Sequence, residues 1–172
     1  MDIEQDPIIR GFKIARNFPY GKYRLGEIFR GLEASPAISG LGESEQGAYD
    51  LRDLDVEITD DVKYMRVSDV DGRLLIGPKY LRRGRKEFIY LDLIHELTHI
   101  RQFRQGHDIY NPKYSYIERP TELEAFANAV VEARRIGLSD VEIYEYLRVD
   151  WISESELEEL AKKLGVTSAQ KK

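Results

Sequence analysis

The sequence predicts an α+β fold, in which a small antiparallel sheet of about three strands packs against two long helices. Apolar residues recur at helical spacing over residues 86–105 and again over 120–136, which predicts the helices. Apolar and polar residues alternate over 55–76, which predicts the strands. We expect the 172 residues to form one domain, 1–172, with an N-terminal extension 1–54, a core 55–135 and C-terminal helices 136–172.

Regular structure is expected to be sparse before residue 55. Two prolines and two glycines interrupt residues 1–21, which we expect to wrap the surface. Apolar residues at helical spacing predict a short helix over 22–34, which Ser35-Pro36 ends. Glycines and acids predict a loop over 37–49, a natural place for a mobile flap or a cleavage site.

Three short strands are expected in the following segment. Val56 and Ile58 alternate with polar neighbours, and residues 64–68 alternate in the same way. Asp71-Gly72 is typical of a hairpin turn, and it precedes a third strand over 73–76. The segment therefore predicts three antiparallel strands.

The helix over 86–105 carries the motif His95-Glu96-Leu97-Thr98-His99. Positions i and i+4 of a helix lie on one face, so the two imidazoles can bind one metal ion. Glu96 can then reach a water on that metal and act as general base, which is the HExxH arrangement of zinc hydrolases. The chain has no cysteine, so histidines and carboxylates must hold any such metal.

The same two histidines could instead be core residues that bond to the backbone or to a carboxylate. Apolar residues surround the motif on its helix, among them Phe88, Leu91, Ile94 and Leu97. Burying two imidazoles and the Glu96 carboxylate without partners would cost free energy. A bound metal would remove that cost, so the apolar surroundings favour a metal site.

A zinc site of this type needs a third protein ligand, and three residues are candidates. His107 lies eight residues after His99, but the position three after His99 is Gln, so the HExxHxxGxxH pattern fails. Glu122 lies near the start of the second helix, in line with alanines that permit close helix packing. Glu124 has Asn128 four residues later, which could hydrogen-bond a ligand histidine. We favour Glu122 and keep Glu124 as the alternative.

Two further helices are expected near the C-terminus. Ser139 with Glu142 and Ser153 with Glu156 form capping boxes that begin them, and Gly165 ends the second. The last helix has one apolar face. We expect this face to pack on the core or, alternatively, on a partner chain in a homodimer.

Composition and charge exclude several classes of function. The net charge of -5 argues against a general nucleic-acid binder, and the basic run 82–86 is expected to be a solvated loop. Apolar runs are far shorter than the roughly 20 residues that span a bilayer, and residues 1–9 lack the basic residues of a secretory signal. We therefore expect a cytoplasmic protein. Charged residues make up 33% of the chain, a balance found in proteins of thermophiles.

The two motifs together resemble a known family. His95–His99 followed by Glu122-Leu123-Glu124-Ala125-Phe126 is similar to the gluzincin metallopeptidases. The ExEA string looks like the glutamate helix of membrane peptidases in the CAAX-protease and heat-shock-protease group. There the first glutamate binds zinc, which implies Glu122, and an Asp follows where this chain has Phe126. Glu124 to Asn128 matches instead the ExxAN string of small metallopeptidase-like regulators that cleave repressors.

The overall resemblance, over roughly residues 55–135, is to the archaeal minigluzincins, soluble minimal versions of those membrane enzymes. Some of these small proteins are similar to zymogens, in which a terminal segment lies across the cleft. The resemblance therefore implies that the chain is latent.

Taken together, the motifs predict a zinc metallopeptidase that hydrolyses a peptide or protein substrate. Glu96 would take a proton from the zinc-bound water and pass it to the leaving amine, while Tyr116 or Tyr114 stabilises the oxyanion. We expect the substrate to add to a free strand edge at Leu74–Ile76. The alternative is a regulatory or binding protein that keeps the Zn²⁺ site without strong peptidase activity and binds through the basic run 82–86.

Overall fold

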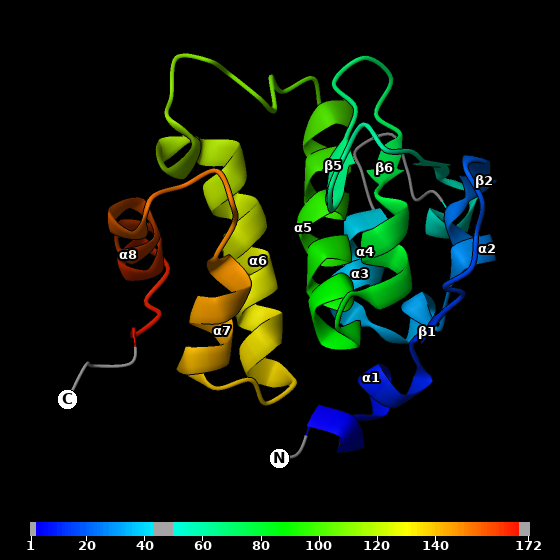
Figure 1. Cartoon of the computed structure of the whole chain (residues 1–172), viewed down its shortest axis with the longest axis horizontal. Helices are drawn as coiled ribbons and strands as arrows, with labels where there is room; N and C mark the ends of the chain where they lie inside the picture. The colour runs from blue at the N-terminus through cyan, green and yellow to red at the C-terminus, as the bar shows by residue number, and fades with distance from the viewer. Residues whose placement is uncertain (1–2, 43–49, 169–172) are drawn as a thin grey trace.

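The computed structural model describes residues 3–42 and 50–168 of the chain and has the α+β architecture that the sequence predicts. Helix α5 (Lys86–Arg104) runs through the middle of the molecule (Figure 1). The sheet and the short N-terminal helices lie on one side of α5. On the other side lie α6 (Pro120–Arg135), α7 (Asp140–Leu147) and α8 (Glu154–Lys163).

Helix α5 forms within one residue of its predicted bounds. Most of its side chains are buried, including Ile89, Leu93 and Leu97, because the sheet packs on one face and α6 on another. The helix ends before Gly106, whose φ of +83° is a left-handed conformation that glycine adopts without strain. Apolar packing therefore holds this helix rigidly at the centre of the fold.

The row of alanines on α6 packs against α5 as predicted. Ala125, Ala129 and Ala133 are fully buried, and α6 contacts α5 along its length. Small side chains let the two helices approach closely. Pro120 occupies the first turn of α6, where its missing N–H costs no hydrogen bond. The close packing of the two helices places the beginning of α6 beside the second half of α5.

The sheet has one strand more than predicted, and one of its three pairings is parallel. Its order is β2 (Gly21–Arg24), β4 (Asp55–Ile58), β6 (Leu74–Ile76) and β5 (Met65–Val67). The hairpin predicted at Asp71-Gly72 is confirmed, since β5 and β6 are antiparallel neighbours. Strand β2 also pairs antiparallel with β4, whereas β4 and β6 are parallel. The sheet is therefore mixed.

The prediction of a free sheet edge at Leu74–Ile76 is wrong. Strand β6 lies between β4 and β5, so both of its edges are paired. A continuous apolar run of this kind is typical of a strand that is buried on both faces. The strand that lies at the sheet edge and contacts α5 is β5. The free edge that we expected at Leu74–Ile76 therefore lies at Met65–Val67.

The prediction of one helix over residues 22–34 is also wrong. This segment divides into β2, α2 (Leu25–Ile28), β3 (Phe29–Arg30) and the 3-10 turn η2 (Leu32–Ala34). Gly31 has a φ of +80°, and a Cβ there would lie 2.4 Å from the Gly11 carbonyl oxygen. The chain turns at this glycine, so a continuous helix cannot pass through it.

The rest of the N-terminal extension consists of short elements. They are η1 (Ile3–Gln5), α1 (Pro7–Gly11), β1 (Lys13–Ile14), α3 (Pro36–Ser39), η3 (Gly40–Gly42) and η4 (Leu51–Asp53). Strand β1 pairs with β3. Residues 37–42 of the loop predicted as a mobile flap are thus largely helical. Its remainder, 43–49, lies outside the described residues.

The C-terminal helices begin where the sequence predicts. Both capping boxes are confirmed, with Ser139 and Ser153 each accepting a hydrogen bond from the backbone N–H three residues later. Leu157, Leu160 and Ala161 of α8 are buried in the core, so the first of the two expected packing partners is confirmed. The basic run 82–86 is not a loop throughout, since α4 (Pro78–Arg83) includes its first two residues.

One hydrophobic core joins the extension, the sheet and the C-terminal helices. Its buried residues range from Ile9 and Phe12 to Leu160 and Val166. Among the residues that the structure describes, no helix combines the length and the apolar surface needed to cross a membrane.

Candidate metal centre

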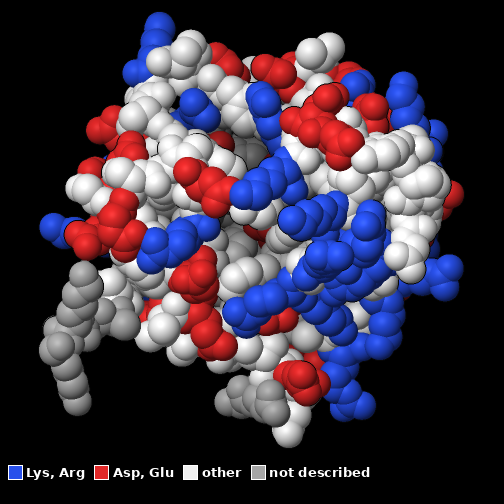
Figure 2. Space-filling model, viewed as in Figure 1, with Lys and Arg blue, Asp and Glu red and all other residues white. Residues whose placement is uncertain are grey.

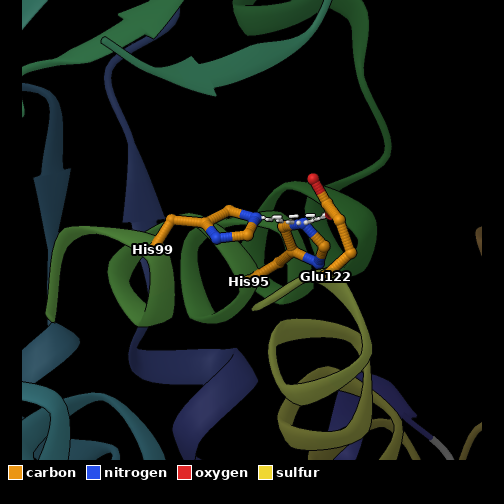
Figure 3. Close-up of side chains that lie close together, drawn as sticks. All are labelled: His95, His99 and Glu122. Carbon is orange, nitrogen blue, oxygen red and sulfur yellow. Dashed lines mark hydrogen bonds and ion pairs between the residues drawn. The ribbon is translucent and has the colours of Figure 1, made fainter. Parts of the chain in front are cut away.

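His95, His99 and Glu122 lie together where the second half of α5 meets the beginning of α6 (Figure 3). Nε2 of His95 lies 3.1 Å from Nε2 of His99. Oε2 of Glu122 lies 3.1 Å from Nε2 of His95 and 3.3 Å from Nε2 of His99. All three side chains are buried. The three atoms form a compact group that could hold a metal ion.

Local sequence explains how the three side chains meet. His95 and His99 are one turn apart on α5, so their rings project from the same face. Glu122 lies in the first turn of α6, at the end of the alanine row that packs on α5. The close packing of the two helices thus brings the carboxylate to the histidines.

Glu124, the alternative ligand, lies outside this group. Its carboxylate accepts hydrogen bonds from Arg101 at 2.5 Å and from the Gln102 amide at 2.6 Å, and its side chain is 48% exposed. Asn128 donates to the Thr98 hydroxyl at 3.2 Å rather than to a histidine. Of the two candidate glutamates, Glu122 is the one that the fold brings to the histidines.

Gln102 orients the ring of His99. Its Oε1 lies 2.8 Å from Nδ1 of His99, and its amide donates to the Thr121 carbonyl at 3.0 Å as well as to Glu124. Once a metal ion displaces the proton on Nε2, a proton kept on Nδ1 leaves the Nε2 lone pair directed at the group, which is the tautomer that metal binding requires. The glutamine thus connects the histidine to α6 at the position where the HExxHxxGxxH pattern has glycine.

Burial and proximity shift the pKa values of the three side chains. Burial lowers the pKa of His95. Burial also acts to lower that of His99, but the Glu122 carboxylate outweighs it and raises the His99 pKa to about 9. For Glu122, burial acts to raise the pKa, yet the two imidazoles hold it well below its usual range. Glu122 is therefore ionised at neutral pH, as a metal ligand must be.

Glu96 is buried next to the same group. Its Oε2 has no hydrogen-bond partner in the described part of the chain. Burial raises the pKa of Glu96 to about 8, although the positive charge of His99 acts in the opposite direction. A carboxylate whose pKa lies near neutrality can exchange a proton with a bound molecule.

Glu96 and the three-residue group open into one cavity of about 700 Å³. The edge strand β5 and the turn before it form one wall, and Tyr110, Tyr116 and Arg119 form another. The cavity is large enough for several residues of an extended chain. Its position gives a bound molecule access to Glu96 and to the three-residue group together.

Of the two tyrosines proposed as oxyanion donors, Tyr116 lines the cavity and Tyr114 does not. Tyr116 lies in the 3-10 turn η5 (Tyr116–Glu118), and its ring packs 6.2 Å from that of Phe126. Burial raises the Tyr116 pKa well above its ordinary value, so its hydroxyl keeps its proton at neutral pH. Tyr114 is 45% exposed.

The connection between α7 and α8 forms a further wall of the cavity. The Trp151 ring lies 5.7 Å from that of Tyr116 and 6.4 Å from that of Tyr64. Asp150 forms an ion pair with Lys63 and accepts a hydrogen bond from the Tyr64 hydroxyl at 3.2 Å. The C-terminal part of the chain is thus joined across the cavity to the turn that precedes β5.

Two other features of the sequence lie away from the cavity. His107 is exposed, just past the end of α5, so it does not join the metal-binding group. The basic run 82–86 is part of a larger basic face, on which Lys and Arg gather over α4, β1 and α1 (Figure 2). Its exposed cations include Arg10, Lys13, Arg82 and Arg83.

Sequence reasoning missed several residues of the cavity. Arg119 lies three residues before Glu122, and its guanidinium is 3.6 Å from that carboxylate; this spacing is a signal that could have been used. Asp92 lies one turn before Glu96 on α5, and helical periodicity could have placed it in the cavity. Trp151 reaches the cavity through tertiary packing, for which the sequence has no local signal.

The chain was compared with protein-family models, with curated proteins and with solved structures, and none of the three comparisons finds a match. The interpretation of the site therefore depends on its own geometry.

Proposed function

We propose that the protein is a zinc-dependent metallopeptidase of the gluzincin type. The observation that supports this most directly is that Glu96 and the group of His95, His99 and Glu122 open into one cavity. A buried glutamate with an unpartnered oxygen, beside two imidazoles and a carboxylate, is the set of residues that hydrolytic zinc sites use.

The three side chains fit a zinc ion. Zinc binds imidazole nitrogen and carboxylate oxygen at about 2.0–2.2 Å in a tetrahedron, which sets neighbouring ligand atoms about 3.3 Å apart. The separations of 3.1 to 3.3 Å between Nε2 of His95, Nε2 of His99 and Oε2 of Glu122 agree with this spacing. Three protein ligands would leave a fourth position for reactants, as in catalytic zinc sites.

The chain's own residues then have separate roles. A bound zinc ion supplies Lewis acidity toward a carbonyl oxygen and a water molecule. Glu96 accepts a proton from the attacking water through its unpartnered Oε2 and delivers it to the leaving amine. The Tyr116 hydroxyl, which stays protonated, donates a hydrogen bond to the developing oxyanion.

The edge of β5 supports a peptide as the substrate class. β5 is an edge strand of the sheet, and Met65 and Arg66 line the cavity. An extended peptide can add to such an edge through main-chain hydrogen bonds. The Tyr110 hydroxyl already donates to the Val67 carbonyl at 2.6 Å, so a peptide would pair with the part of β5 before Val67.

Elemental analysis and a peptide-cleavage assay on the full chain test this proposal. We expect about one zinc ion per chain, as purified or after titration, and much less in His99→Ala. Glu96→Gln should keep the zinc and lose cleavage of a mixed peptide pool by about 10²-fold or more. Glu118→Gln, an exposed acid outside the cavity, is the matched control and should cleave normally. A chain that takes up no zinc would refute the proposal.

The second candidate function is a binding protein that keeps the metal site without cleaving peptides. The basic face over α4, β1 and α1 favours it, because cations collected on one side of a chain with net charge -5 can bind a polyanion. Retention of the full chain on double-stranded DNA at physiological salt, together with loss of retention in Arg82→Gln/Arg83→Gln, would favour this function.

A further inference from the structure

The cavity continues beyond the metal centre along α5, past Asp92 to Phe88. Asp92 precedes Glu96 by four residues, so the two side chains project from the same face, about 6 Å apart along the axis. Asp92 is half-buried and lines the same cavity as Glu96. A substrate held at Glu96 would thus place an adjacent side chain near Asp92.

The carboxylate of Asp92 has no cationic partner among the described residues. The Tyr80 hydroxyl donates a hydrogen bond to it, and the Tyr146 hydroxyl lies near it without forming a well-aligned hydrogen bond. Burial raises the Asp92 pKa to about 6, while these hydroxyls lower it, so the group is largely ionised at pH 7. A negative charge is therefore held in the cavity by neutral groups.

The cations of the cavity are engaged elsewhere. Lys63 pairs with Asp150, Arg119 lies 3.6 Å from Glu122, and Arg148 pairs with Glu154. The Arg66 guanidinium lies over the ring of Tyr110, 4.6 Å from its centroid. None of these forms an ion pair with Asp92, so the counter-charge is left to a bound molecule.

Two pairs of aromatic rings lie beside Asp92, and each pair includes a tyrosine whose hydroxyl approaches its carboxylate. Tyr64 and Tyr80 meet edge to face at 5.3 Å between centroids, and Phe88 and Tyr146 do so at 5.5 Å. All four line the cavity. A lysine or arginine side chain has an apolar stem that packs on such rings and a cationic end that binds a carboxylate. The lining therefore matches a basic side chain in both shape and charge.

We propose that Asp92 and these four aromatic residues form a subsite for a lysine or arginine side chain next to the scissile bond of the substrate. Asp92 would then be a specificity-determining residue. Because the subsite is defined relative to a scissile bond, this inference rests on the proposed peptidase function. The same carboxylate could instead bind the α-ammonium group of a free N-terminus, and the experiment separates the two sources.

A binding measurement tests the subsite without requiring cleavage. The zinc-loaded full chain carrying Glu96→Gln, which prevents turnover, is titrated with acetyl-Ala-Arg-Ala-amide and with acetyl-Ala-citrulline-Ala-amide. Citrulline keeps the shape of arginine and lacks its charge. We expect the arginine peptide to bind about tenfold more tightly, since a charge-assisted contact is lost with citrulline.

Variants assign the preference to one carboxylate. Asp92→Asn should reduce it to about twofold or less, whereas Asp61→Asn, another acid lining the cavity, should leave it in place. Equal binding of the two peptides, failure of both to bind, or a preference that survives Asp92→Asn would overturn the proposal. If Asp92→Asn does not fold, the arginine and citrulline comparison decides by itself.

One further peptide, Ala-citrulline-Ala-amide with a free N-terminus, tests the other source of positive charge. The subsite proposal expects it to bind like its acetylated form. Binding as tight as that of the arginine peptide would identify the α-ammonium group as the ligand and overturn the side-chain assignment. Because no step needs cleavage, this outcome is distinct from a failure of the peptidase proposal.

Discussion

The side-chain oxygen of Gln102 lies 2.8 Å from Nδ1 of His99, while Nε2 of the same ring lies 3.3 Å from the Glu122 carboxylate. The imidazole is thus held from both ends, by one residue on its own helix and by one on α6. Gln102 itself is fixed by its hydrogen bond to the Thr121 carbonyl. The ring orientation at the metal centre therefore depends on the contact between α5 and α6.

The first prediction concerns Gln102→Leu, which removes the partner of Nδ1 with little change in volume. Zinc affinity should fall about 10- to 100-fold, because the His99 ring and its tautomer are no longer fixed. Competition with a chromogenic chelator measures the affinity. The control is Gln105→Leu, an exposed position at the end of the same helix, which should bind zinc normally. Unchanged affinity in Gln102→Leu would show that this hydrogen bond does not orient the ring.

The second prediction separates the two glutamates of α6. Glu122→Gln replaces the anionic carboxylate, whose Oε2 lies within 3.3 Å of both Nε2 atoms, by a neutral amide that binds zinc weakly, so zinc affinity should fall about 100-fold or more. Glu124→Gln changes a residue that contacts Arg101 and Gln102, so the loss should be about tenfold or less. The same chelator competition checks both variants. A larger effect in Glu124→Gln than in Glu122→Gln would reverse the assignment.

Local signals explain which parts of this site could be predicted from the sequence. The i, i+4 spacing placed His95 and His99 on one face, and the row of alanines placed Glu122 against α5. Capping residues located the starts of α7 and α8. Each of these signals depends on residues within a few turns of one another.

What could not be predicted depends on contacts between distant segments. Pairing of Leu74–Ile76 with Asp55–Ile58 makes β6 a central strand, and pairing of Gly21–Arg24 with β4 turns part of an expected helix into a strand. Trp151 reaches the cavity because the connection between α7 and α8 packs against Tyr116 and Tyr64. A hydrophobic pattern defines which residues are buried, but it leaves open the strand against which they are paired.

The third prediction concerns the buried Asp6, which joins the N-terminal extension to α6. Its carboxylate caps α1 by accepting from the backbone N–H groups of Ile8 and Ile9, and it accepts from Arg135 at 2.9 Å. Asp6→Asn should lower the free energy of unfolding by about 1–3 kcal/mol at pH 7, because the charge-assisted bond is lost. Chemical denaturation measures this, and Asp69→Asn at an exposed position is the control.

The stabilisation by Asp6 should depend on pH in a defined direction. Burial acts to raise the Asp6 pKa, but Arg135 and the two backbone N–H groups outweigh it and hold the pKa below 3.8. A group whose pKa is lowered on folding stabilises the protein above its unfolded pKa and loses that effect as the pH falls through its folded pKa. The difference between the wild type and Asp6→Asn should therefore be constant above about pH 5 and shrink below about pH 4. A difference that is as large at pH 2 as at pH 7 would contradict this assignment.

The last prediction uses Trp151, the only tryptophan of the chain, as a reporter of the cavity. Its indole is 56% exposed and lies against Tyr116 and Tyr64 at the wall that the α7–α8 connection forms. A peptide bound along β5 would displace water from this ring, so its fluorescence emission should shift to shorter wavelength on titration with the acetylated arginine peptide. Trp151→Phe removes the signal, and calorimetry on that variant checks that the peptide still binds. Calorimetric binding without any change in the emission of the wild type would place the peptide away from this wall and, with it, away from the β5 edge.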